Sequence, residues 1–99
     1  MYNYFMLIGR LSKMETLDDN SNSIVLNCVD TFKDANGKYN SKDYHISCPQ
    51  YVYDVVKENA ELGEFLAIKG HVEPNQVTNM VLLVADRVMF MRGEANDRN

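Results

Sequence analysis

The sequence predicts an all-β domain, a closed barrel of five strands with one short helix between the third and the fourth strand. Three observations lead to this fold class. Short apolar segments recur along the chain with polar stretches between them, which is typical of strands. Residues 49–62 change to the spacing of an amphipathic helix. Gly9 and Gly70 interrupt otherwise apolar segments, as strands bent around a small barrel require.

The first strand is predicted at residues 2–11, where most positions are apolar. The polar stretch that follows, residues 12–23, has the composition of a loop. We place the sharpest bend of the first strand at Gly9. The neighbouring side chains are expected to change face there, so that Arg10 points outward.

The second strand is predicted at residues 23–32, because apolar side chains alternate on one face: Ile24, Leu26 and Cys28. The pair Asn36-Gly37 then signals a reversing hairpin, since both residues tolerate a positive φ. The returning strand is predicted at 43–48. It is closed by Pro49, which has no N–H group to donate to a central ladder.

The helix is predicted over residues 49–62, with Pro49 in its first turn and Gly63 at its C-terminal stop. Its apolar stripe is expected to be core: Val52, Val55, Val56 and Leu62.

A fourth strand is predicted at residues 64–72, followed by the short turn "EPNQ", residues 73–76. The fifth strand is predicted at 79–91, with a bend near 85–86. The polar residues 92–99 are expected to form a short disordered tail.

This order of elements fits the five-stranded Greek-key barrel called the OB-fold, in one domain spanning residues 1–91. The chain has no apolar run near the roughly 18 residues of a membrane span. It also has no recognisable secretory signal. Cys28 and Cys48 suit small buried thiols in a reducing compartment. We therefore expect a cytoplasmic protein.

The net charge of −4 excludes a globally basic nucleic-acid binder but leaves a local basic face possible. The predicted hairpin concentrates lysines: Lys33, Lys38 and Lys42. The sequence shows no catalytic arrangement of residues, phosphate-cradling glycine loop or metal cluster. We expect neither an enzyme nor a bound metal or cofactor.

Four segments resemble the bacterial single-stranded DNA-binding protein family in order and spacing: "NYFMLIGRLSK", "FKDANGKYNSKDYHIS", "LGEFLAIKGHV" and "VLLVADRVMFM". The resemblance covers residues 3–91. It implies sequence-tolerant binding of single-stranded DNA in replication, recombination or repair, with bases stacked on aromatic rings and cations paired with phosphates. It also implies a homodimer or homotetramer assembled through the first strand. The apolar density from Tyr4 to Ile8 suits that contact, because pairing removes an unpaired apolar edge.

Carried over position by position, the resemblance implies two stacking rings, Phe32 and Tyr44, where the family often has tryptophan or another aromatic residue. Further candidates for base or phosphate contact are Lys33, Lys38, Tyr39, Lys42, Arg10 and Lys69. Each candidate has a structural alternative. The rings suit packing over a strand, the lysines suit a soluble hairpin, and Arg10 suits an ion pair with the acidic stretch 15–19.

The chain departs from the family pattern in three ways. It has no tryptophan, its last loop is cut to "EPNQVT", and it lacks the acidic, Phe-ended tail tip that recruits repair enzymes in the family. The leading interpretation is a compact single-stranded DNA-binding protein of the kind encoded on a phage or mobile element. A primosome-type accessory OB-fold protein, and an OB-fold adaptor that does not bind DNA, remain as alternatives.

Overall fold

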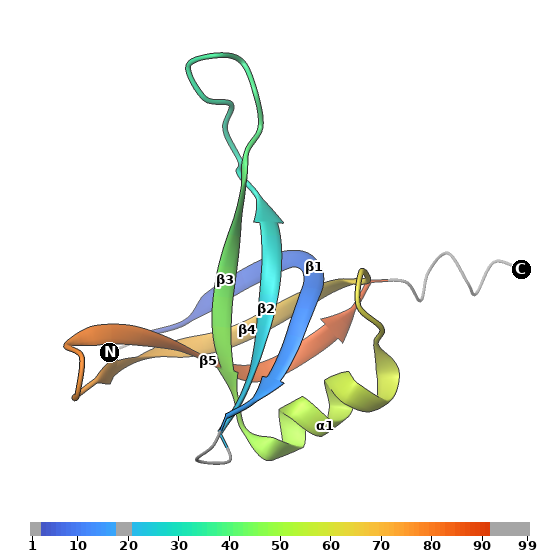
Figure 1. Ribbon diagram of the computed structural model, residues 1–99, viewed down its shortest axis with the longest axis vertical. Coiled ribbons are helices and arrows are strands. Elements are labelled where there is room, and N and C mark those ends of the chain that lie inside the picture. Colours follow the sequence, from blue (N-terminus) through green and yellow to red (C-terminus); the bar gives the residue numbers. More distant parts are fainter. Residues whose placement is uncertain (1–2, 18–20, 92–99) are drawn as a thin grey trace, which may run out of the picture.

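The computed structural model describes residues 3–17 and 21–91. Its strands form a closed barrel in the order β1-β2-β3-β5-β4. The elements are β1 (Phe5–Thr16), β2 (Asn22–Val29), β3 (Ser41–Cys48), α1 (Gln50–Asn59), β4 (Phe65–Asn75) and β5 (Met80–Phe90). Figure 1 shows α1 beneath one end of the barrel and two long hairpins that project from it. This is the architecture of the OB-fold, so the predicted fold class is confirmed.

β1 continues through the first part of the segment that was predicted as a loop, residues 12–16. Lys13 to Thr16 pair with β2, after a register shift between Leu11 and Lys13. The polar composition of residues 12–16 reflects an exposed outer face rather than a loop. Residue 2 of the predicted first strand and the predicted tail at 92–99 lie outside the described residues.

The predicted change of face at Gly9 is wrong. Exposed and buried side chains alternate without interruption from Ile8 to Leu11, so Arg10 is exposed because of its ordinary place in the strand. Instead, Gly9 allows the backbone of β1 to approach β2 closely, because it has no side chain. A Cβ at this position would lie 2.6 Å from Cys28 Sγ and 2.7 Å from the carbonyl oxygen of Asn27.

The β2–β3 connection forms a projecting arm, which we define as residues 30–42 (Figure 1). β2 ends at Val29, earlier than predicted. The turn is closed by the N–H of Gly37 bonded to the carbonyl of Asp34 at 3.0 Å, and by the N–H of Asp34 bonded to the carbonyl of Lys38 at 2.8 Å. Gly37 has a φ of 76°. The predicted reversal is therefore present, with glycine in the left-handed position.

The helix is shorter than predicted. Pro49 is its N-cap rather than part of its first turn, and the helix ends at Asn59. Ala60 is already extended, and Gly63 turns the chain toward β4 with a φ of 96°. Of the predicted stripe, Val52 and Val56 are buried, whereas Val55 and Leu62 are exposed.

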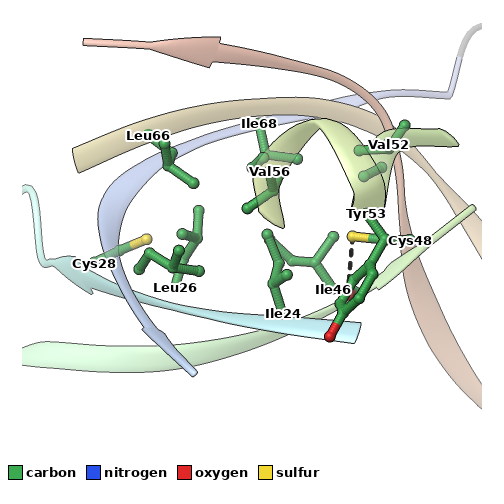
Figure 2. Packing of buried hydrophobic residues seen from close by; sticks show 12 residues of the cluster. Ile24, Leu26, Cys28, Ile46, Cys48, Val52, Tyr53, Val56, Leu66 and Ile68 are labelled. Atoms are coloured by element: carbon green, nitrogen blue, oxygen red, sulfur yellow. Dashed lines mark hydrogen bonds between the residues drawn. The ribbon is translucent and has the colours of Figure 1, made fainter. Parts of the chain in front are cut away.

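Inward-facing side chains of the strands meet the buried face of α1 in one core: Leu11, Ile24, Leu26, Ile46, Leu66, Ile68, Val52, Tyr53 and Val56. Figure 2 shows Val56 above Ile24, with Cys28 and Cys48 toward opposite ends. Both cysteines are free and buried, as predicted. Burial raises the pKa of Cys48 to about 12, and burial followed by the charge of Asp43 raises the pKa of Cys28.

The β4–β5 hairpin is longer than predicted, because Glu73 to Asn75 continue β4 in pairing with β5. The predicted turn "EPNQ" is therefore mostly strand. A register shift between Lys69 and Gly70 leaves Asp86 without a partner in the ladder, where the bend of the fifth strand was predicted. In the described part of the chain, no helix is long and apolar enough to cross a membrane.

Candidate nucleic-acid interface

The arm is held in shape by its own carboxylates. Asp34 accepts the backbone N–H groups of Asn36 at 2.8 Å and Lys38 at 3.0 Å, and the side-chain amide of Asn40 at 2.8 Å. These bonds, that from Lys38 foremost, lower the pKa of Asp34. Because Asp34 is committed to the turn, the arm presents its neighbours in a defined conformation.

The tip of the arm combines rings and cations. Phe32 is 82% exposed and Tyr39 is 58% exposed. The ammonium of Lys33 lies 5.6 Å from the centre of the Tyr39 ring. In the described chain, neither Lys33 nor Lys38 lies within ion-pair distance of a carboxylate. The arm therefore offers flat apolar surface beside positive charge, which is the chemistry that an unpaired nucleotide requires.

Lys42 differs from the other arm lysines. Its Nζ donates to both carboxylate oxygens of Asp30, at 2.7 Å each. The hydrogen bond to Asp30 raises the pKa of Lys42. This pair bridges the two sides of the arm at its base.

Tyr44 lies below the arm and faces a hollow rather than open solvent. It is half-buried and packs against the core. The hollow has a volume of about 460 Å³ and is lined by Met6, Leu7, Ile8, Cys28, Val29, Asp30, Thr31 and Tyr44. It opens where β1 and β2 diverge, since their pairing begins at Arg10 and Asn27. Tyr44 thus lines a recess in which the apolar side chains of β1 and β2 meet the polar residues Asp30 and Thr31.

The remaining two candidates lie on the outer face of β1 and β4, away from the arm. The Arg10 guanidinium lies 4.6 Å from the centre of the Phe65 ring and donates to the carbonyl of Gly63 at 3.2 Å. Lys69 Nζ lies 5.5 Å from the centre of the Tyr4 ring. The ring and the backbone carbonyl are the contacts that the structure shows for Arg10. Of the carboxylates in the acidic stretch 15–19, the described Glu15 lies 3.9 Å from Lys13 Nζ, and Asp18 and Asp19 lie outside the described residues.

The structure therefore divides the predicted residues into three groups. The arm carries Phe32, Lys33, Lys38, Tyr39 and Lys42, the hollow contains Tyr44, and the β1–β4 face carries Arg10 and Lys69. Sequence reasoning missed Tyr4 and Phe65, the exposed rings beneath two of the cations. The alternation of exposed side chains along β1 was the signal for Tyr4, whereas the pairing of Phe65 with Arg10 required the β1–β4 register.

The two histidines lie apart from these groups. His45 is exposed on the face of β3 opposite Tyr44, and His71 is engaged by Asp86 and Glu73. Within the part of the chain that the structure describes, no group of three or more His, Cys, Asp or Glu residues is arranged to hold a metal ion.

Searches of protein-family models and of curated proteins give no match for this chain. Several solved structures match it over most of its length. A small single-stranded DNA-binding protein from Mycoplasma pneumoniae is 13% identical, with a TM-score of 0.68, and the match covers 90% of this chain and 93% of that one. The mitochondrial single-stranded DNA-binding protein Rim1 from S. cerevisiae is 11% identical, with a TM-score of 0.70 and coverages of 92% and 96%.

A small single-stranded DNA-binding protein from Streptomyces coelicolor is 8% identical, with a TM-score of 0.63, and the match covers 92% of this chain and 95% of that one. At identities this low, the likeness establishes the fold. The chain is thus an OB-fold protein, with the overall structure of the small single-stranded DNA-binding proteins that its sequence resembles.

Proposed function

We propose that this protein binds single-stranded DNA with little base preference and protects exposed strands during replication, recombination or repair. The observation that carries the proposal is the pairing of cations with exposed rings. Lys33, Arg10 and Lys69 each lie over an aromatic ring at the surface of an OB-fold barrel. Stacking ignores base identity because every base has a flat face, and the neighbouring cation is placed for the adjoining phosphate.

In this proposal the arm makes the first contact. Bases stack on Phe32 and Tyr39, while Lys33 and Lys38 pair with phosphates. The strand then passes the hollow, where a base contacts the edge of the Tyr44 ring. Arg10 and Lys69 supply further phosphate contacts on the β1–β4 face, and Lys42 contributes less because Asp30 already holds its ammonium.

We further propose that the protein is a homodimer or homotetramer assembled through β1. In the described chain, Phe5 to Gly9 pair with β4 along one edge, and pairing with β2 begins at Arg10. The outward side chains Tyr4, Met6 and Ile8 are all more than half exposed. A second copy paired with this strand satisfies the open edge beside the apolar row.

Fluorescence anisotropy of a labelled oligo-dT strand, titrated at 50 mM and 200 mM salt, tests the proposal. Each phosphate contact on a single strand should lower log affinity by about 0.7 per log unit of salt. We expect binding at the lower salt and a slope that corresponds to several contacts. An oligo-dA strand should bind with similar salt dependence, because the phosphate contacts are the same.

Absence of binding at 50 mM salt would overturn the proposal and favour the adaptor alternative. Salt-dependent binding together with specific capture of a helicase or helicase loader would instead favour the accessory role. Phe32→Ala and Tyr44→Ala identify which surface the strand uses.

A further inference from the structure

Asp30 forms an ion pair with Lys42 at the base of the arm. Its carboxylate receives Lys42 Nζ through two bonds of 2.7 Å, as a phosphate group does when it pairs with an ammonium. The Asp30 side chain is 25% exposed and the Lys42 side chain 61% exposed, so the pair is accessible to a ligand. Asp30 also lines the hollow that contains Tyr44. The carboxylate thus stands between the stacking recess and one of the arm cations.

This arrangement changes what Lys42 contributes to binding. A phosphate that takes the ammonium from Asp30 leaves that carboxylate unpaired and next to the incoming negative charge. This exchange therefore adds little to the binding free energy. A phosphate contact at Lys33 or Lys38 adds more, because neither ammonium is paired with a carboxylate in the described chain. A strand that carries phosphates but no bases therefore binds the arm less tightly than the number of lysines in the arm suggests. Stacking of bases on the rings is unaffected.

We propose that Asp30 is a specificity-determining residue, because it takes the place of a phosphate at Lys42. Tight binding then requires bases that stack on the rings as well as phosphates. The inference rests on the proposed function, because it concerns the same DNA-binding surface. The ligand class that Asp30 selects is a polyanion carrying unstacked aromatic bases, and the class that it disfavours is a polyanion without them.

The experiment compares two probes of equal length and charge: oligo-dT, and an abasic strand in which every nucleoside is replaced by tetrahydrofuran. Asp30→Asn frees Lys42 and keeps the shape of the side chain. Asp43→Asn is the matched control, because it also removes one negative charge, in this case from β3 next to the arm. The Asp43 carboxylate accepts a hydrogen bond from Asn27 and not from a lysine. The double variant Asp30→Asn/Lys42→Met tests whether the effect passes through Lys42.

For Asp30→Asn we expect the abasic strand to bind roughly two- to fivefold more tightly than it binds wild type, the range of an exposed ion pair. Its salt slope should steepen by about 0.7, the value for one added phosphate contact. The ratio of oligo-dT affinity to abasic affinity should fall. Asp43→Asn should leave this ratio and the slope unchanged, and the double variant should lose the gain.

Equal effects of Asp30→Asn and Asp43→Asn would overturn the inference, because they would reflect overall charge alone. Weaker binding by Asp30→Asn would also overturn it, since Asp30 would then position Lys42 for DNA. Either result leaves wild-type binding to oligo-dT intact and so leaves the proposed function standing. Wild type that fails to bind oligo-dT even at 50 mM salt overturns both.

Discussion

At the scale of single residues, the two predicted stacking rings occupy unlike environments. Phe32 stands on the arm with 82% of its surface exposed, whereas Tyr44 is half-buried against the core. A phenyl ring that is exposed on the arm can stack on a base without disturbing the fold. The Tyr44 ring serves the fold as well as any ligand.

Phe32→Ala should weaken oligo-dT binding by about 1–1.5 kcal/mol, which is the lower part of the range for one stacked base. Its melting temperature should match that of wild type, because the ring is exposed. Tyr51→Ala is the control: this ring is also exposed, but it lies on α1, away from the arm. Anisotropy titrations and thermal melts measure both quantities. Equal affinities of Phe32→Ala and wild type would remove the arm from the interface.

Tyr44→Ala should combine two effects. It removes a ring from the hollow and also from a packed position, so both affinity and melting temperature should fall. Tyr44→Leu keeps apolar volume and should restore much of the stability without restoring the affinity. If Tyr44→Leu binds oligo-dT as wild type does, then bases do not stack on this ring.

His71 links the two strands of the β4–β5 hairpin at the register shift. Its Nδ1 lies 2.9 Å from Asp86 Oδ2, and its Nε2 lies 2.5 Å from Glu73 Oε2. The hydrogen bond to Asp86 and then that to Glu73 raise the pKa of His71. Protonated, the ring donates to both carboxylates, so the imidazolium form is favoured in the folded chain.

Stability should therefore depend on pH through His71. A folded pKa above the unfolded value of about 6.5 gives stability that is fully present below pH 6.5. It is lost as pH rises through the raised pKa of the folded state. In thermal melts between pH 5.5 and 9, the melting temperature of wild type should exceed that of His71→Gln most at pH 5.5 to 6.5. The difference in melting temperature should shrink above that range. A difference that grows with pH would contradict the assignment.

At the scale of elements, the sequence was sufficient to predict the number, order and type of the strands and the helix. Apolar alternation and turn residues such as Asn36 and Gly37 are local signals. Element ends were less predictable. Thr16 and Glu73 look like loop residues, but pairing with β2 and β5 makes them strand, and that pairing is a tertiary effect.

The candidate site was predictable to a smaller extent. The arm residues are neighbours in sequence, so their clustering followed from the hairpin. The contact of Arg10 with Phe65 and that of Lys69 with Tyr4 depend on the register of β1 against β4, which no local pattern specifies. The Asp30–Lys42 pair likewise requires the two sides of the arm to be aligned.

Gly70 should be the glycine least tolerant of substitution. A Cβ there would lie 1.9 Å from the carbonyl oxygen of Val84 and 2.8 Å from the Phe5 ring, so β4 and β5 would have to separate. Gly70→Ala should lower the free energy of unfolding, measured in urea, by about 3 kcal/mol or more. Gly37→Ala meets no atom within 4 Å and should cost about 1 kcal/mol through its φ of +76°. Similar losses for the two variants would show that the bulge accommodates a methyl group.

At the scale of the whole molecule, a net charge of −4 must be reconciled with the polyanionic ligand that we propose. Part of the negative charge is committed within the chain: Asp34 to the arm turn, Asp30 to Lys42, and Asp86 to His71. The ring-bound cations remain at the surface. Long-range attraction of DNA should therefore be weak, and the proposed binding depends on short-range contacts at the rings.

If each chain attracts DNA only weakly, the proposed self-association should strengthen the proposed binding, because linked copies bind one strand at high effective concentration. Ile8→Lys places a charge in the exposed apolar row of β1 and should convert the proposed dimer or tetramer to a monomer in light scattering after size exclusion. Val81→Lys is the matched control, since Val81 is a similarly exposed strand residue on β5.

Loss of assembly should lower the affinity for a long oligo-dT strand at least tenfold, because multivalent binding commonly exceeds single-site affinity by about 10²–10⁴. Affinity for a strand that spans one protomer should change less, since its contacts lie on one chain. If wild type is already a monomer, or if Val81→Lys dissociates it equally, the contact does not run through β1. The apolar row from Tyr4 to Ile8 then requires another explanation.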